Sequence, residues 1–224
     1  RYHHLFADLL EQRLQVSQSN RVSELHCRAS QWFAENGFKN EAVDHALVAQ
    51  DNDYAAQLIE EIAEIDWDRA RESRLLGWFK KLPDELIDAN SKLCIFYARE
   101  LFKSGYVDDA EKKLQTAEHL LDSISISTSK KEGLLGRIAV IRAYISTRTG
   151  DLSCTIAFSK QALKLLPQGD LNWRSVAATT LGMGLVTGKL AEQQEAFVEA
   201  MKISKAAGNV YYHIFAGSCL GSIL

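Results

Sequence analysis

The hydrophobic residues of this chain recur at helical intervals, in segments such as "NDYAAQLIEEIAEI" and "LCIFYARELF". Three- and four-residue spacing places apolar side chains on one face of an α-helix. No stretch rich in Val, Ile and Thr alternates with polar residues as a half-buried strand would. Only two prolines occur, Pro83 and Pro167, and both stand where helices are expected to begin or end. The pattern predicts an all-α chain.

The helices that this pattern predicts follow one another with short connections. The stretch "DSISISTSKKEG", over 122–133, has low complexity and is expected to form a longer connector. The predicted helices lie near 3–16, 21–35, 40–49, 53–64, 69–81, 84–88, 91–104, 107–122, 131–148, 152–166, 171–187, 190–206 and 210–224.

Four similar segments each begin at a glycine: "GFKNEAVDHALVA", "GYVDDAEKKLQTA", "GDLSCTIAFSKQA" and "GKLAEQQEAFVEA". Glycine suits the turn between two antiparallel helices, where a positive φ is often required. Small residues at fixed later positions would let the second helix approach its neighbours closely. The glycines are Gly37, Gly105, Gly150 and Gly188; five positions later stand Ala42, Ala110, Thr155 and Gln193, and twelve positions later Ala49, Ala117, Ala162 and Ala200.

These segments resemble the tetratricopeptide repeat, a helix–turn–helix unit of about 34 residues. The Gly150 segment matches best, because Pro167 closes its second helix where the repeat has a proline. Each hairpin leaves an apolar face uncovered, so that neighbouring hairpins must stack. The resemblance implies a right-handed superhelical solenoid of such hairpins.

Composition and charge make some classes of function less plausible for this chain. The net charge of −3 disfavours binding to a phosphate backbone through bulk positive charge. No run of about 18 apolar residues and no export signal is visible, so we expect a cytoplasmic protein without membrane contact. The four cysteines are widely spaced and are expected to be reduced.

The sequence shows no residue pattern typical of a catalytic or metal-binding site. No nucleophile stands at a meaningful spacing from a base, and the carboxylates are typical of solvated helix faces, so no enzyme activity is expected. His3 and His4 are adjacent, but further ligands at helical spacing are missing. Most aromatic residues, among them Trp32 and Phe197, are expected to pack in the core.

A ligand surface is expected on the first helix of each hairpin, which lines the concave side of such solenoids. Counting back from the turn glycines selects Arg99, Lys103, Arg137, Tyr144 and Arg148. Four cations and an aromatic ring suit a polar or anionic small molecule, or an acidic peptide. The alternative is that these residues are ordinary solvated charges.

Four blocks in order carry a second resemblance: "RYHHLFADLLEQRL", "LHCRASQWFAENGFKNEAVDHALVAQDNDYAAQLIE", "LLGWFKKLPDELIDANSKLCIFYARELFKSGYVDDAEKKLQTAE" and "GDLSCTIAFSKQALKLLP". Together they resemble MalT-type transcription regulators, the large ATP-binding members of the LuxR group. The resemblance implies that 1–20 ends a winged-helix segment, that 21–89 forms a helical arm, and that 90–224 begins a repeat sensor truncated at its C-terminus.

The MalT-type resemblance also implies partners and cofactors of a larger parent protein. The chain has no phosphate loop, so ATP or ADP would bind elsewhere in the parent, where His3 would contact the nucleotide phosphate. DNA and RNA polymerase would be engaged only through other domains. The segment itself would bind a small-molecule inducer or a regulatory protein, and an unfinished last hairpin could promote self-association. The alternative is a free-standing repeat scaffold that binds a partner peptide or helix.

Overall fold

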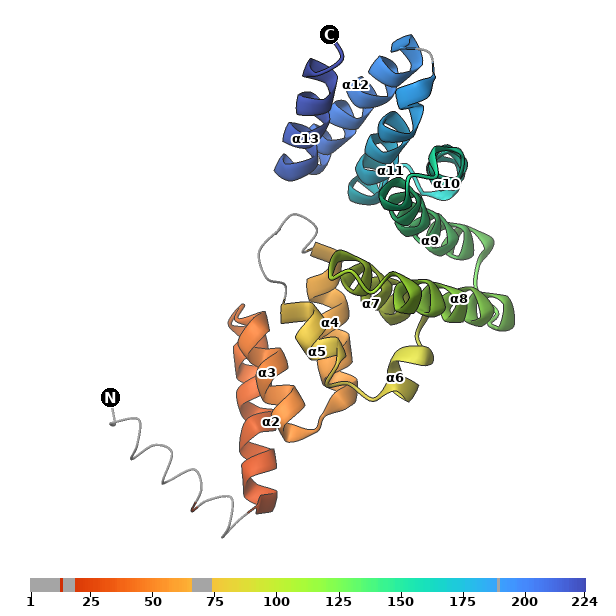
Figure 1. Ribbon diagram of the computed structural model, residues 1–224. Helices are drawn as coiled ribbons and strands as arrows, with labels where there is room; N and C mark the ends of the chain where they lie inside the picture. Colours follow the sequence, from red (N-terminus) through yellow and green to blue (C-terminus); the bar gives the residue numbers. More distant parts are fainter. Residues whose placement is uncertain (1–12, 14–18, 66–73, 189) are drawn as a thin grey trace. The chain divides into compact units, whose positions relative to one another are not determined.

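A computed structural model describes residue 13 and residues 19–65, 74–188 and 190–224. Within those ranges the chain forms helices and turns and contains no strand (Figure 1). The all-α prediction is therefore confirmed for the described part of the chain. The predicted helix over 3–16, the start of the one over 69–81, and His3 lie outside the described residues.

The chain divides into two compact units. Unit 1 comprises 1–65 and 77–86, and its described core is formed by the consecutive helices α2 (Ser19–Glu35), α3 (Lys39–Ala49) and α4 (Asn52–Ile65). Helix α3 packs against both α2 and α4. The hydroxyl of Ser30 donates to the carbonyl of Ala42 at 2.7 Å, which fixes α2 on α3. The short helices α5 (Arg74–Phe79) and α6 (Asp84–Asp88) lie where the two units divide.

Unit 2 comprises 66–76 and 87–224 and is built from consecutive pairs of helices. Each odd-numbered helix packs against the even-numbered helix that follows it and against the next odd-numbered helix. Figure 1 shows these neighbours side by side. The helices are α7 (Ser91–Lys103), α8 (Val107–Ser123), α9 (Thr128–Thr149), α10 (Leu152–Leu165), α11 (Leu171–Gly184), η1 (Leu185–Thr187), α12 (Leu190–Ala207) and α13 (Val210–Gly221).

Glycines with positive φ end several of these helices. Gly37, Gly105 and Gly150 have φ of +82°, +89° and +79°, as predicted for turns between paired helices. Gly188 differs: its φ is −92°, and it follows the short helix η1 in extended backbone. Gly208, which the sequence pattern did not select, has φ +69° and separates α12 from α13. The prediction of a left-handed turn is thus wrong at Gly188, where η1 reverses the chain instead.

The residues five and twelve positions after each of the four repeat glycines are buried, as the repeat pattern predicts. Each lies on the second helix of a pair, where a larger side chain would hold the neighbouring helix away. The buried positions are Ala42, Ala110, Thr155 and Gln193, and then Ala49, Ala117, Ala162 and Ala200.

Two expectations differ from the structure. The stretch 122–133 is not a long connector, because α8 runs to Ser123 and α9 already begins at Thr128. Ser127 caps α9 by accepting a hydrogen bond from the backbone N–H of Lys130, so serine acts here as a helix start signal. Trp32 is 55% exposed and stacks on Phe38 at the surface of unit 1, so its assignment to the core is wrong.

Candidate functional site

Helix α7 carries a buried ion pair at the start of the candidate site. Arg99 and Glu100 are 5% and 2% exposed, and Nε of Arg99 donates to Oε1 of Glu100 at 2.9 Å. Lys103, one turn later, lies 3.1 Å from the other carboxylate oxygen and is partly exposed. The guanidinium of Arg99 also lies 5.2 Å from the ring centre of Phe96. Glu100 therefore holds two cations in fixed positions on one helix.

Helix α9 contributes an aromatic ring and a third cation. The ring of Tyr144 lies 5.2 Å from that of Phe102 on α7, centre to centre. The guanidinium of Arg148 lies 5.4 Å from the Phe102 ring centre, while its side chain remains exposed. A cation over an aromatic face gains electrostatic attraction without losing its charge. The buried ring of Phe102 therefore contacts both Tyr144 and Arg148.

Helix α13 brings Tyr212 to the same group of side chains. Burial is the main cause that raises the pKa of Tyr212 well above its usual value, and the nearby charge of Arg99 partly opposes this rise. Burial also raises the pKa of Tyr144. The hydrogen bond with the Tyr212 hydroxyl lowers this pKa, but by less than burial raises it. Both tyrosines therefore keep their hydroxyl protons at neutral pH, and the two hydroxyls are hydrogen-bonded to each other.

We refer to these side chains as the α7–α9–α13 cluster. Its cations outnumber its carboxylates by three to one, since Glu100 is the only acidic member. Arg99 and Glu100 are buried and paired with each other, so the excess positive charge lies on the exposed Lys103 and Arg148. The cluster consists of Arg99, Glu100, Phe102, Lys103, Tyr144, Arg148 and Tyr212.

Arg137, the remaining residue that the sequence selected, has different neighbours. It forms an ion pair with Asp170 at 3.0 Å, and both side chains are largely buried. Its guanidinium also lies 5.1 Å from the ring centre of the fully buried Trp173. These contacts tie α9 to the start of α11, so Arg137 supports the packing of unit 2.

The structure thus brings together Arg99, Lys103, Tyr144 and Arg148 among the residues predicted for ligand binding. The sequence did not select Glu100 or Tyr212. Glu100 looked like an ordinary surface charge on α7, because sequence spacing does not reveal that both neighbouring cations turn toward it. Tyr212 follows a glycine turn that had not been recognised at Gly208.

A histidine pair in unit 1 also escaped the sequence analysis. The Nδ1 atoms of His26 on α2 and His45 on α3 lie 2.7 Å apart. The His45 ring stacks on Phe33 with 5.2 Å between ring centres. Nineteen residues separate the two histidines, and only the packing of α2 on α3 brings them together. Among the described residues, no group of three or more His, Cys, Asp or Glu side chains is arranged to hold a metal ion.

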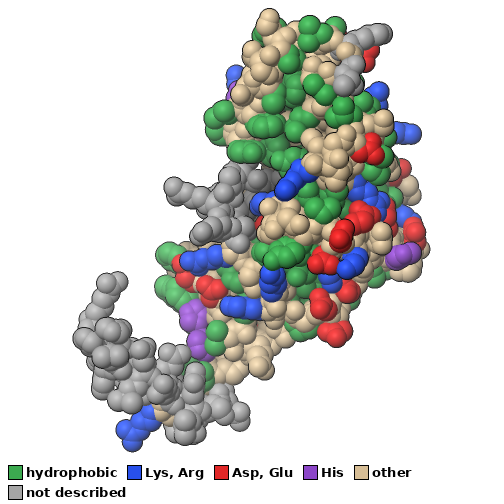
Figure 2. Space-filling view, viewed as in Figure 1, with side chains coloured by type: hydrophobic (Ala, Val, Ile, Leu, Met, Phe, Trp, Pro, Cys, Tyr) green, Lys and Arg blue, Asp and Glu red, His purple; other side chains and the backbone are tan. Residues whose placement is uncertain are grey.

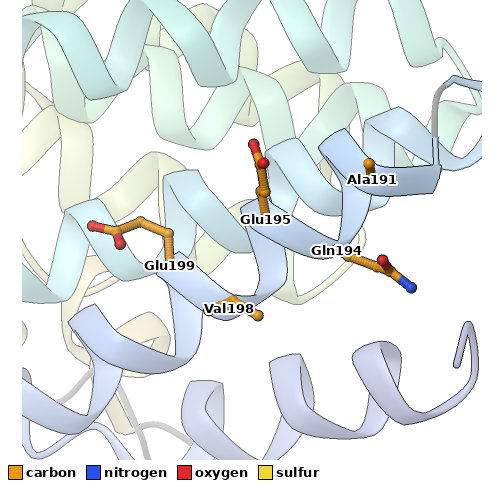
Figure 3. A pocket seen from close by; sticks show the side chains of 5 residues that line it. All are labelled: Ala191, Gln194, Glu195, Val198 and Glu199. Atoms are coloured by element: carbon orange, nitrogen blue, oxygen red, sulfur yellow. The ribbon is translucent and has the colours of Figure 1, made fainter.

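An open hollow of about 520 Å³ lies along the outer side of α12. Its lining residues all come from this one helix (Figure 3), and all except the partly buried Gln194 are exposed. Two of them are carboxylates one turn apart, Glu195 and Glu199, so the hollow is acidic where the α7–α9–α13 cluster is basic. The others are Ala191, Gln194 and Val198.

Comparisons with known proteins give a partial match to protein kinases. The serine/threonine-protein kinase PknK of Mycobacterium tuberculosis is 44% identical over 93 residues, which is 42% of this chain and 8% of the kinase. PknK of Mycobacterium bovis matches with the same figures. The chain thus corresponds to a small fraction of the length of these relatives. No protein-family model matches the sequence. In the part of the chain that the structure describes, no helix has the length and apolar character needed to cross a membrane.

Proposed function

We propose that this chain is a signal-sensing repeat module of a MalT-type, ATP-dependent transcription regulator. In this proposal unit 2 is a right-handed solenoid of tetratricopeptide-like hairpins. The α7–α9–α13 cluster on its odd-numbered helices binds an anionic inducer or an acidic segment of a regulatory protein. The observation that carries the proposal is the cluster itself, since three helices far apart in sequence converge on it with excess positive charge.

The packing of unit 2 supports the solenoid. Consecutive odd-numbered helices pack on one another, while each even-numbered helix packs on its predecessor and on the next odd-numbered helix. This order repeats from α7 to α13. Left-handed glycines separate the two helices of a pair at Gly105 and Gly150, and Gly208 separates α12 from α13. Such nearest-neighbour packing is typical of helical repeat proteins.

The chemistry of the cluster supports an anionic ligand. Lys103 and Arg148 are accessible to solvent, and the partly exposed Tyr144 keeps its hydroxyl proton at neutral pH. An arginine and a lysine beside hydrogen-bond donors suit carboxylate or phosphate oxygens. The partly exposed ring of Tyr144, which packs on the buried Phe102, adds an aromatic surface against which a ring or an aliphatic chain can lie.

The match to PknK supports a role inside a larger signalling protein. In the kinase, the matching segment is a small part of a much longer chain, and its name places that chain among signalling enzymes. For the parent of this chain we propose that ATP or ADP binds upstream, with His3 sensing the phosphate. DNA and RNA polymerase are contacted through other domains, and the segment itself has no catalytic role. The four cysteines, none of them in a disulfide, suit a reducing cytoplasm.

Binding can be tested with a fluorescein-labelled peptide of alternating glutamate and tyrosine residues, followed by fluorescence anisotropy. The double variant Lys103→Glu with Arg148→Glu should weaken binding by roughly tenfold or more, because two attractive charges become repulsive. The matched control, Lys160→Glu with Lys164→Glu, makes the same charge change on exposed positions of α10 and should bind like the wild type. An equal loss of peptide affinity in both double variants would indicate non-specific electrostatic attraction and contradict the proposal.

The parent architecture is tested by reading the gene on either side of this segment. A MalT-type regulator requires a phosphate loop encoded upstream and a helix-turn-helix encoded downstream. A gene that encodes neither would leave the second candidate, a free-standing scaffold that binds a partner peptide or helix on the same odd-numbered helices.

A further inference from the structure

Glu100 holds the exposed Lys103 in place through both of its carboxylate oxygens. Nζ of Lys103 lies 3.1 Å from Oε2 and 3.4 Å from Oε1 of Glu100, and Oε1 also accepts a hydrogen bond from Nε of Arg99. A lysine ammonium has three N–H donors, so Lys103 can contact Glu100 and still donate to a ligand. The side chain of Glu100 is 2% exposed, whereas that of Lys103 is 36% exposed. A ligand therefore reaches the ammonium from the solvent side, with the carboxylate behind it.

Arg148, the second exposed cation of the cluster, has no carboxylate beside it. Its guanidinium lies over Phe102 and forms no hydrogen bond or ion pair with the residues that the structure describes. Over α8 and α9, by contrast, Lys and Arg side chains lie beside Asp and Glu side chains on the face shown in Figure 2. Arg142, for example, contacts Glu111 and Glu118. The fork of N–H groups on Arg148 is thus available to the oxygens of an anionic ligand.

The charges nearest to the solvent side of the cluster sum to one positive charge. Lys103 and Arg148 contribute two positive charges, and the carboxylate of Glu100 subtracts one. Arg99 is 5% exposed, and its guanidinium lies over Phe96, about two turns of α7 before Lys103. Arg99 is therefore farther from the solvent side than Glu100, and a ligand with one negative charge balances the cations that it can reach.

A second negative charge on the ligand would be repelled by Glu100. A ligand oxygen that accepts from Nζ of Lys103 at about 2.8 Å lies within about 6 Å of Oε2 of Glu100, because Nζ is 3.1 Å from Oε2. Like charges at this distance disfavour each other, and salt screens a buried carboxylate poorly. The repulsion is proportional to the charge of the ligand. It therefore penalises a phosphate monoester, which carries close to two charges near neutral pH, more than a carboxylate, which carries one.

We propose that Glu100 restricts the α7–α9–α13 cluster to anionic groups with a single negative charge, so that the cluster binds a carboxylate in preference to a phosphate monoester. Glu100 acts without touching the ligand: it positions the ammonium of Lys103, and its own charge repels a dianion. The inference rests on the proposed function, since it requires that the cluster binds an anion, and it narrows that anion to one chemical class.

Two probes with the same ring and the same phosphorus group test this selectivity. At about pH 8 phenyl phosphate carries two negative charges, whereas its ester methyl phenyl phosphate carries one. Each probe competes with the fluorescein-labelled glutamate–tyrosine peptide for the wild-type chain, followed by fluorescence anisotropy. Methyl phenyl phosphate should displace the peptide at the same or a lower concentration than phenyl phosphate. Tighter binding of phenyl phosphate would overturn the proposal, and so would the failure of both probes to displace the peptide.

Glu100→Gln removes the charge and retains an oxygen that can accept from Arg99. The affinity should rise about threefold for methyl phenyl phosphate and about tenfold for phenyl phosphate, because the lost repulsion is proportional to the charge of the probe. Glu132→Gln, the same change at an exposed position of α9, should alter neither affinity. An equal change for both probes, or a loss of affinity for both, would show that Glu100 only positions Lys103 and would overturn the proposal.

Two further readings keep these outcomes distinct. Circular dichroism verifies that both variants keep their helices, and the wild-type comparison of the two probes decides by itself if Glu100→Gln does not fold. A peptide that binds through Lys103 and Arg148, together with an unchanged probe preference in Glu100→Gln, refutes only the role of Glu100. A peptide that does not bind the wild type refutes the proposed function, and this inference with it.

Discussion

The ring of Phe197 on α12 occupies the space beside Gly182 of α11, where any larger residue would place its side chain. A Cβ atom at position 182 would lie 2.7 Å from Cε1 of Phe197, which is closer than packed carbon atoms approach. Phe197 is itself 2% exposed and packed against Ala178 and Ala200. The contact between α11 and α12 therefore depends on the absence of a side chain at one residue.

Gly182→Ala should destabilise unit 2 despite the higher helix propensity of alanine. The buried ring has little room to move, and overpacking of this kind costs about 1–3 kcal/mol of unfolding free energy. Chemical denaturation followed by circular dichroism measures the change. Gly221→Ala is the matched control, because the equivalent position on α13 is open; it should be neutral or slightly stabilising in dilute solution. Equal destabilisation by the two variants would contradict this account.

Arg142 should contribute to stability by joining α9 to α8. Its guanidinium donates to Glu111 and Glu118, with closest distances of 2.7 Å to each carboxylate. Burial opposes its charge, but the hydrogen bonds to Glu118 and Glu111 outweigh burial and raise the pKa of Arg142. Arg142→Ala should lower the unfolding free energy by about 1–3 kcal/mol, because two carboxylates lose their partner. Lys112→Ala, which removes an exposed ion pair with Asp109, should leave the melting temperature unchanged.

Thiol reactivity should distinguish Cys94 from Cys154. Burial, followed by the nearby charge of Asp88, raises the pKa of Cys94 to about 12, and its Sγ donates to the carbonyl of Ile87. The folded state therefore keeps this proton more tightly than the unfolded chain. The protonated thiol of Cys94 therefore stabilises the folded state. This contribution to the free energy of unfolding is fully present below the ordinary cysteine pKa of about 8.5 and is lost as pH rises toward 12.

A thiol-specific reagent at about pH 8, near the ordinary cysteine pKa, should therefore modify the exposed Cys154 and leave Cys94 intact until the protein unfolds. Peptide mass spectrometry identifies the modified residue. Modification of Cys94 in the native state, at the rate seen in denaturant, would show that α7 does not bury it.

The helices and most of their turns could be predicted because they depend on local signals. Apolar spacing identifies the helices, and Gly37, Gly105 and Gly150 adopt the positive φ that glycine tolerates best. Gly188 is the exception. It stands in the same sequence pattern, but the short helix η1 before it reverses the direction of the chain, so Gly188 itself has extended backbone. Sequence similarity among repeats therefore did not fix the backbone conformation of each turn.

The candidate site could be predicted only in part, because its assembly depends on tertiary packing. The rule that first helices of a pair face the ligand selected Arg99, Lys103, Tyr144 and Arg148, which do come together. The same rule also selected Arg137, which forms an ion pair with Asp170. The two residues are 33 positions apart in sequence, so local sequence patterns could not predict this ion pair. The prediction for Trp32 was wrong for a related reason: its spacing suits a core residue, but within the described ranges no helix covers it.

Hydrogen–deuterium exchange with mass spectrometry, with and without the glutamate–tyrosine peptide, tests most directly whether the odd-numbered helices of unit 2 receive the ligand. Bound peptide should slow amide exchange in α7, α9 and α13, and the Lys103→Glu, Arg148→Glu variant should lose this protection. Protection confined to α8, α10 and α12, or to unit 1, would contradict a binding surface at the α7–α9–α13 cluster.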